Sequence, residues 1–284
     1  MSKYDAMLKR IITGVIAAAL LAVVCIFAND IVFSVVFGLL ALLGVYEMLG
    51  CIGARRNFTI SLCMYAMTIL AIVLVHTTSR HSMYITTYAG ILFCVLLILL
   101  ASAVFSEGQV PVDKVCIAFT TCSYVITGFI SIILLRDMYM GRYVYLLAFI
   151  GPWVSDTFAY FTGMFLGKHK LIPSVSPKKT IEGSLGGILF CIIGCIIYGY
   201  VIKTISGGEA EIHVAFMALL GLIISIVSQI GDLIFSLIKR RYDIKDYGFI
   251  FPGHGGVLDR FDSVIATAPL ILIACESLAR LNFM

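Results

Sequence analysis

Apolar runs long enough to cross a lipid bilayer recur from one end of this 284-residue chain to the other. A transmembrane helix needs about 20 such residues in succession. Charged residues make up only 13% of the chain, whereas they make up about 25% of soluble domains. The runs are continuously apolar, unlike the strands of a transmembrane β-barrel, which alternate apolar and polar residues. The sequence therefore predicts an all-α, polytopic bundle of transmembrane helices.

We predict nine spanning helices, with the N-terminus in the cytoplasm. The first apolar run is longer than the core of a signal peptide, which has about 7–15 residues, so an uncleaved span is preferred. This arrangement places fifteen of the 20 Lys and Arg residues on the cytoplasmic side, as the positive-inside rule requires. The predicted spans are 11–28, 31–50, 58–76, 82–105, 115–136, 143–166, 183–205, 213–237 and 262–280.

The chain is predicted to form one integral membrane unit whose chemistry is concentrated in its C-terminal half. Residues 1–140 are interpreted as scaffold helices, and residues 141–284 as the catalytic transmembrane region with its cytoplasmic loops. The nine cysteines lie mostly within apolar runs, and none forms a CxxC pair. We interpret them as small packing residues rather than as a disulfide framework or a thiolate metal site.

Polar residues gather at the end of the predicted span 213–237. In a helix, Asp232, Ser236 and Lys239 would share one face, because they are spaced at i, i+4 and i+7. A carboxylate at such a depth is costly unless it faces a cavity, a partner or a metal. The alternative is an ion pair between Asp232 and Lys239 that merely ends the span.

The loop that follows is rich in cations and glycines. It contains Lys239, Arg240, Arg241 and Lys245, and then the run PGHGG at 252–256. Glycines let backbone N–H groups approach an anion closely, although they also occur in ordinary turns. Cations beside a membrane also act as topology signals or as contacts to lipid headgroups. Together with the acids that follow, the loop favours a site for a phosphorylated substrate.

Two acids, Asp259 and Asp262, begin the last predicted span at i, i+3 spacing. They would complement the positive end of the helix dipole, or they would hold Mg²⁺, which prefers oxygen ligands and shares them with substrate phosphates. We favour Asp232 and Asp259 as carboxylates that converge from two helices on one metal site. Lys239 and Arg240 would then neutralise the charge that builds up on a phosphate.

A second polar cluster lies in the predicted span 143–166 and in the loop after it. Asp156 stands deep inside an apolar helix and marks a polar interior. Gly163 and Gly167 are predicted to let this helix pack closely on another. The loop adds hydroxyl and ammonium groups that suit a phosphate clamp, without matching the Walker pattern. These loop residues are Ser176, Lys178, Lys179 and Thr180.

The run Ser236–Asp262 has the pattern S-x-x-K-R-x4-K-D-x-G-x3-P-G-H-G-G-x2-D-R-x-D. This pattern resembles the signature of the phosphatidate cytidylyltransferase family, the CDP-diacylglycerol synthases. The upstream segments SDTFAYFTGMFLGKHK and SPKKTIEG also resemble that family. A signature of this length is far more specific than a lone glycine motif.

The resemblance implies an Mg²⁺-dependent enzyme that converts CTP and phosphatidate into CDP-diacylglycerol and pyrophosphate. It also implies a metal centre on Asp232 and Asp259, a second, monovalent cation such as K⁺, and a homodimer in the bilayer, with no nucleic acid partner. We expect a bacterial inner membrane with the active site at its cytoplasmic side. Asp156 is assigned either to the metal cluster or to the cytidine, and Asp262 is a further candidate metal ligand. The predicted catalytic residues are Asp232, Asp259, Lys239 and Arg240. The substrate-binding candidates are Ser176, Lys178, Lys179, Thr180, Ser236, Lys245, His254, Gly255, Gly256 and Arg260.

Two other classes of protein remain open at this stage. A transporter or channel would use buried acids such as Asp156 and Asp232 to relay protons or cations, but it leaves the basic, glycine-rich loop unexplained. A membrane kinase that phosphorylates a dolichol or polyprenol with CTP would also combine apolar spans with basic loops. The kinase would release CDP, whereas cytidylyl transfer releases pyrophosphate.

Overall fold

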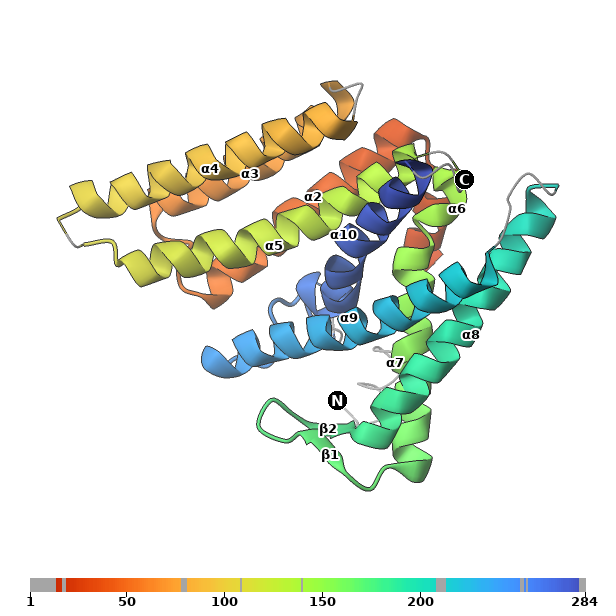
Figure 1. Cartoon of the computed structure of the whole chain (residues 1–284). Helices are drawn as coiled ribbons and strands as arrows, with labels where there is room; N and C mark the ends of the chain where they lie inside the picture. The colour runs from red at the N-terminus through yellow and green to blue at the C-terminus, as the bar shows by residue number, and fades with distance from the viewer. Residues whose placement is uncertain are drawn as a thin grey trace. The chain divides into compact units, whose positions relative to one another are not determined.

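The computed structural model describes residues 14–16, 19–77, 81–107, 109–138, 140–207, 213–250, 253 and 255–280 (Figure 1). Its helices are α2 (Asp30–Cys51), α3 (Phe58–Thr77), α4 (His81–Phe105), α5 (Val112–Asp137), α6 (Gly141–Val144), α7 (Leu147–Leu166), α8 (Ile181–Ile205), α9 (Val214–Arg241) and α10 (Leu258–Arg280). Two short strands, β1 (Lys170–Ile172) and β2 (Ser176–Thr180), connect α7 to α8.

The prediction of an all-α polytopic bundle is confirmed. Within the described residues, seven helical stretches are long and apolar enough to cross a membrane, from α2 to α9. The predicted first span, 11–28, lies partly outside the described residues. Helix α10 forms where the last span was predicted, but it is not among the seven. Acidic and basic residues, among them Asp259, Arg260 and Asp262, make its first turns polar. The orientation of the termini stays a prediction.

A β-hairpin stands where the sequence predicted a loop. Strand β1 pairs with β2 in antiparallel fashion, with Lys170 opposite Thr180 and Ile172 opposite Ser176. The hairpin is tied to α8 by Glu182, whose carboxylate contacts His169 Nδ1 at 2.6 Å and accepts the backbone N–H groups of Lys168 and His169. The strands are too short and too polar for an alternating pattern to reveal them.

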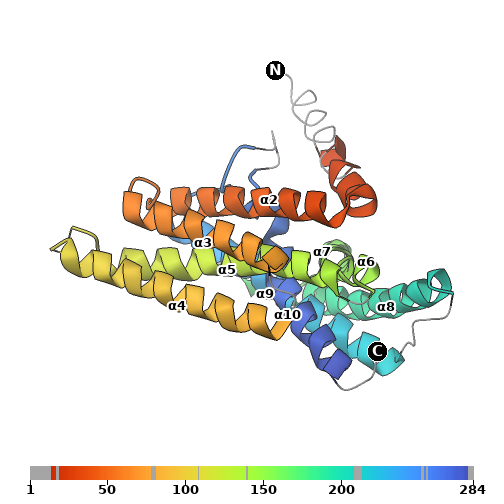
Figure 2. The ribbon, with the colours of Figure 1, turned by 90° about the horizontal axis from the view of Figure 1, so that it is seen from above.

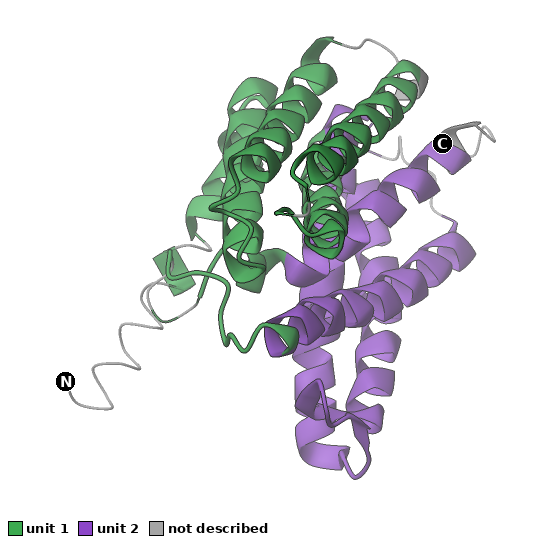
Figure 3. Cartoon of the chain, turned by 90° about the vertical axis from the view of Figure 1, so that its left-hand side faces the viewer, with its two compact units in different colours: residues 1–133, 241–261 green, residues 134–240, 262–284 purple. Residues whose placement is uncertain are grey.

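The chain forms two compact units (Figure 3). Unit 1 comprises residues 1–133 and 241–261, so the glycine-rich part of the predicted loop belongs to the same unit as helices α2 to α4. Lys239 and Arg240, which were predicted to lie in this loop, are in the last turn of α9 and belong to unit 2. In this unit α2 packs on α3 and α3 packs on α4 (Figure 2). Its core includes the fully buried side chains of Phe33, Phe37, Met64 and Phe129. The predicted functional division at residue 140 stays a prediction.

Unit 2 comprises Leu134–Arg240 and Asp262–Met284. Helices α7 and α8 lie side by side along much of their length, as Figure 1 shows. Glycines make this approach close: a Cβ atom added to Gly183 would lie 2.7 Å from the carbonyl oxygen of Ala159 and 3.1 Å from the Cα of Gly163. The close packing predicted for Gly163 is therefore confirmed.

Replacing Gly183 with Val is expected to lower the thermal midpoint of the purified protein. The added side chain must push α8 away from α7, and overpacking of this kind costs about 1–3 kcal/mol. The matched control is Gly90→Val in α4, because a Cβ atom at Gly90 has no neighbour within 4 Å. Equal midpoints for the two variants would contradict the close contact between α7 and α8.

Candidate active site

Helix α9 carries the first predicted site residues. It runs without interruption from Val214 to Arg241, so Asp232, Ser236 and Lys239 do share one face of a helix. Gly231 is buried, and a side chain there would collide with the Cβ of Ala266 and lie 3.1 Å from the carbonyl oxygen of Asp262. The missing side chain at position 231 therefore lets α9 and α10 approach closely beside the two acids.

Three carboxylates from three helices of unit 2 interact electrostatically. They belong to Asp156 of α7, Asp232 of α9 and Asp262 of α10. Ser263 links two of them, because its hydroxyl group lies 3.3 Å from Asp156 Oδ2 and its backbone N–H donates to Asp262 Oδ1 at 2.8 Å. Like charges at short range repel one another, so this carboxylate cluster is a place that favours cations.

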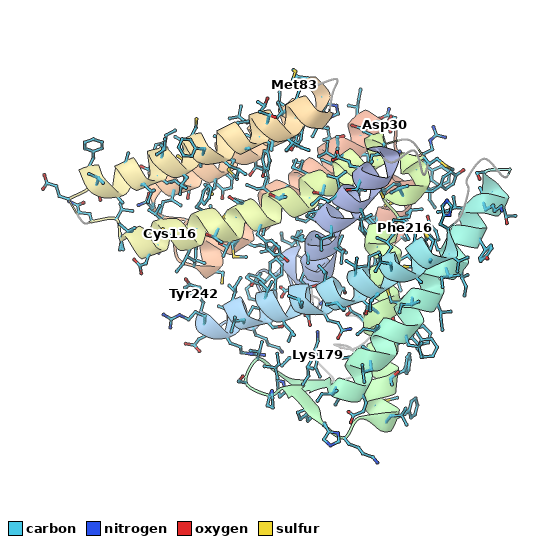
Figure 4. All side chains as sticks on the ribbon, viewed as in Figure 1. Asp30, Met83, Cys116, Lys179, Phe216 and Tyr242 are labelled. Carbon is cyan, nitrogen blue, oxygen red and sulfur yellow. The ribbon has the colours of Figure 1, made fainter. Side chains whose placement is uncertain are left out.

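Lys179 supplies one positive charge to the carboxylate cluster. It lies on β2 and forms an ion pair with Asp232, and each of the two side chains is 26% exposed. Figure 4 marks Lys179 between the hairpin and α9. The partner of Asp232 in this structure is thus Lys179 of the hairpin. The alternative reading of the sequence had paired Asp232 with Lys239 on the same helix.

A neutral hydrogen-bond network joins α7, α8 and α9 next to the carboxylate cluster. The hydroxyl groups of Ser155 and Ser225 lie 2.7 Å apart, and Gln229 Nε2 donates to Ser225 Oγ at 3.2 Å. Ser184 Oγ donates to Gln229 Oε1 at 2.5 Å. Sequence reasoning singled out Ser155 beside Asp156 but missed Ser184, Ser225 and Gln229. The 3–4 residue spacing of Ser225, Gln229 and Asp232 in an apolar helix was the available signal.

Asp259, the other predicted metal ligand, lies in unit 1 and contacts backbone amides. Its Oδ2 atom accepts hydrogen bonds from the N–H groups of Tyr247 at 2.7 Å and Gly256 at 2.9 Å. Gly255 has a φ of +85°, and a side chain there would lie 2.7 Å from the same oxygen. Asp259 thus joins two positions of the glycine-rich loop, Tyr247 and Gly256, through its carboxylate. Its predicted pairing with Asp232 at a metal stays a prediction.

The other predicted site residues take several different positions. Thr180 is the N-cap of α8 and accepts the N–H of Gly183 at 3.1 Å, so its hydroxyl group already has a structural role. His254 lies outside the described residues. Ser176, Ser236 and Lys239 are half-buried, and Lys178, Arg240, Lys245 and Arg260 are exposed.

An apolar cavity of about 210 Å³ lies between α9 and α10 in unit 2. The two helices that line it also carry the two acids: Asp232 follows the lining residues of α9, and Asp262 precedes those of α10, each by about one to two turns. The cavity is lined by Leu220, Ile223, Ile224, Val227, Thr267, Leu270, Ile271, Ile273 and Ala274.

Comparison with known proteins agrees with the resemblance noted in the sequence. Residues 8–278 match the cytidylyltransferase family. The chain belongs to this family. It is 32% identical to the phosphatidate cytidylyltransferase of Bacillus subtilis (strain 168) over 271 residues, which are 93% of this chain and 96% of that protein. It is 38% identical to the phosphatidate cytidylyltransferase of Staphylococcus haemolyticus over 176 residues, which are 62% of this chain and only 65% of that protein.

The carboxylate cluster of this chain suits an Mg²⁺ ion that is bound partly by the protein and partly by substrate phosphates. Among the described residues, no three His, Cys, Asp or Glu side chains are arranged to hold a metal ion as a set. Mg²⁺ in nucleotide sites, however, is commonly bound by one or two carboxylates together with substrate phosphates. The neighbouring carboxylates of Asp232 and Asp262 meet that need, with Asp156 close by.

Two adjacent lysines of the hairpin are expected to differ sharply in importance. Lys179→Ala should lower kcat/KM about 10–100-fold, because a charge-assisted contact to a phosphate is worth about 1.5–3 kcal/mol. Lys178 is exposed, so Lys178→Ala should act mainly on substrate binding and cost about threefold or less. Steady-state rates of the two purified variants provide the comparison. A larger loss for Lys178→Ala would contradict the assignment of Lys179 to the site.

Proposed function

We propose that this protein transfers the cytidylyl group of CTP to phosphatidate, giving CDP-diacylglycerol and pyrophosphate for phospholipid synthesis. The single observation that carries the proposal is the cluster of Asp156, Asp232 and Asp262 with Lys179, in a chain of the cytidylyltransferase family. Acids and a cation gathered on apolar helices suit a phosphorylated nucleotide and a membrane lipid as substrates.

The reaction is a displacement at the α-phosphorus of CTP. A phosphate oxygen of phosphatidate forms the new P–O bond, and the bond to pyrophosphate breaks. The phosphatidate phosphomonoester is already anionic, so the step needs no strong general base. The barrier comes from bringing two anions together, and fixed cations lower it by positioning them and neutralising their charge.

Each residue of the cluster has a place in this proposal. Asp232 and Asp262, with Asp156 close by, would hold Mg²⁺ together with the substrate phosphates, and the bound ion would stabilise negative charge on those phosphates. The ammonium group of Lys179 would turn from Asp232 to a substrate phosphate. Asp259 stays a predicted ligand of the same metal site.

Further proposals concern the surroundings of the site. The apolar cavity between α9 and α10 suits part of an acyl chain, because it is lined by aliphatic side chains on the helices of the carboxylate cluster. We also propose a second, monovalent cation such as K⁺, a homodimer, and a bacterial inner membrane with the active site on the cytoplasmic side. The basic loops predicted to face the cytoplasm support this orientation.

The test uses purified protein in mixed micelles with phosphatidate, Mg²⁺ and CTP labelled at the α-phosphate. We expect label in the chloroform-soluble lipid, release of pyrophosphate, and loss of both with EDTA. Release of CDP instead would indicate a lipid kinase. An absence of lipid label from folded protein would overturn the proposal.

A further inference from the structure

Glu47 is a buried acid in residues 1–140, which were predicted to be scaffold helices. It lies on α2, and only 2% of its surface is exposed. A buried charge is strongly unfavourable unless it is paired and hydrogen-bonded. The partners of Glu47 therefore indicate what it does.

The two carboxylate oxygens of Glu47 bind the beginning of α10. Oε1 accepts the N–H of Val257 and Oε2 accepts the N–H of Leu258, each at 2.9 Å. The first N–H groups of a helix have no partner within the helix itself, and both residues are fully buried from water. The negative charge also complements the positive end of the helix dipole. Glu47 therefore caps α10 from another helix.

The glycine-rich loop passes directly over the Glu47 carboxylate. A side chain at Gly248 or at Gly256 would collide with the Glu47 carboxylate and would have to displace it from this position. Asp259 holds the same loop from the other side, through the N–H groups of Tyr247 and Gly256. Two carboxylates thus contact the loop at Tyr247 and Gly248 and again at Gly256–Leu258.

The position of Glu47 is itself determined by packing in unit 1. A side chain at Gly44, one turn earlier on α2, would lie 3.1 Å from Leu258 and 3.3 Å from Phe129. Phe129 in turn packs on Phe261 of α10, with ring centroids 5.4 Å apart. The close packing of α2 on α5 and on the start of α10 therefore places the Glu47 carboxylate beside the first residues of α10.

We propose that Glu47 is a positioning residue for cytidylyl transfer. It holds the described ends of the loop, at Gly248 and at Gly256–Leu258, and the first turn of α10, and these segments carry the predicted site residues Gly256 and Asp259. This inference rests on the proposed function for its catalytic consequence. The mechanical part, that Glu47 holds the loop, rests on unit 1 alone.

The test compares Glu47→Gln, Glu47→Asp and the control Ser34→Ala in the full-length protein. Gln preserves the shape of Glu but presents an NH₂ group to one of the two backbone donors, so one hydrogen bond becomes a repulsive contact. Asp keeps the charge but is shorter. Ser34 is buried on the same helix, and its hydroxyl group donates to the carbonyl oxygen of Asp30 in that helix.

Amide hydrogen exchange and steady-state kinetics are measured on each variant. For Glu47→Gln we expect exchange about tenfold faster in residues 247–258, with α3 and α4 unchanged. We also expect kcat about 100-fold lower, because small misplacements of catalytic groups have effects of that size. Glu47→Asp should lie between Glu47→Gln and the wild-type protein in both measurements, and Ser34→Ala should match the wild type.

Normal loop exchange with normal kcat in both Glu47 variants would overturn the inference. So would exchange that accelerates equally throughout unit 1 in both variants, since that indicates general destabilisation. An absence of cytidylyl transfer in the wild-type protein would overturn the proposed function alone. The exchange data would still decide whether Glu47 holds the loop.

Discussion

Replacing Asp232 with Asn is expected to lower kcat about 1,000-fold or more. Loss of an outer partner of a metal ligand costs about 10–100-fold, and loss of a ligand costs more. Asp232 lies beside Asp262 and forms an ion pair with Lys179, so it contacts both the neighbouring acid and the cation of the cluster. Asn has nearly the same shape, and the fold should persist. Initial rates of lipid labelling across an Mg²⁺ titration measure the effect.

Asp243→Asn is the matched control for this prediction. Asp243 is exposed just beyond α9, with a φ of +52° that Asn adopts readily. The same chemical change there should leave the rate within about twofold of wild type. A wild-type rate and Mg²⁺ dependence in Asp232→Asn would contradict the proposed role of Asp232 as a metal ligand.

Asp259→Asn is expected to abolish turnover while leaving the protein folded in detergent. A single oxygen, Oδ2, accepts both loop hydrogen bonds. The carbonyl oxygen of Asn can take the place of Oδ2 in these two hydrogen bonds, so this variant removes the negative charge while it keeps both contacts to the loop. Loss of activity would then indicate that the charge acts on a metal or a phosphate. Lipid labelling measures turnover, and amide exchange of residues 247–256 reports on the loop.

Asp259→Ala completes the comparison, because it removes both the charge and the hydrogen bonds. We expect the same loss of turnover as in Asp259→Asn, together with faster amide exchange in the loop. Near-normal activity in Asp259→Asn but not in Asp259→Ala would mean that Asp259 only anchors the loop. That result would remove it from the metal site.

The helices could be predicted from the sequence because the signal for each is local. A continuous apolar run of about 20 residues must satisfy its backbone hydrogen bonds internally in lipid, and a helix does so. Helix α9 contains Asp232, Ser236 and Lys239 as expected. The hairpin of β1 and β2 was missed because its short strands are polar, and its contacts to Glu182 join residues more than ten positions apart.

The candidate site was predictable in composition but not in its pairings. A basic, acid-containing region beside apolar spans indicated phosphate chemistry, and the structure gathers Asp156, Asp232 and Asp262 accordingly. The choice of Lys179 rather than Lys239 as partner of Asp232 depends on how the hairpin folds back toward α9. Ser184 likewise acquires its contact to Gln229 only when α8 packs on α9, and Ser225 acquires its contact to Ser155 only when α7 packs on α9.

The role of Glu47 could not be predicted from local sequence patterns. The membrane spans, the helices and the family signature could all be predicted from residues that are neighbours in the chain. Backbone hydrogen bonds of a helix and the periodicity of its side chains both act over a few turns. A lone acid in an apolar helix gives no indication of its partner. Its hydrogen bonds to Val257 and Leu258 cross more than 200 positions and exist only because α2 packs against the start of α10. Long-range pairing of buried charge is decided by packing, and packing is a property of the folded chain.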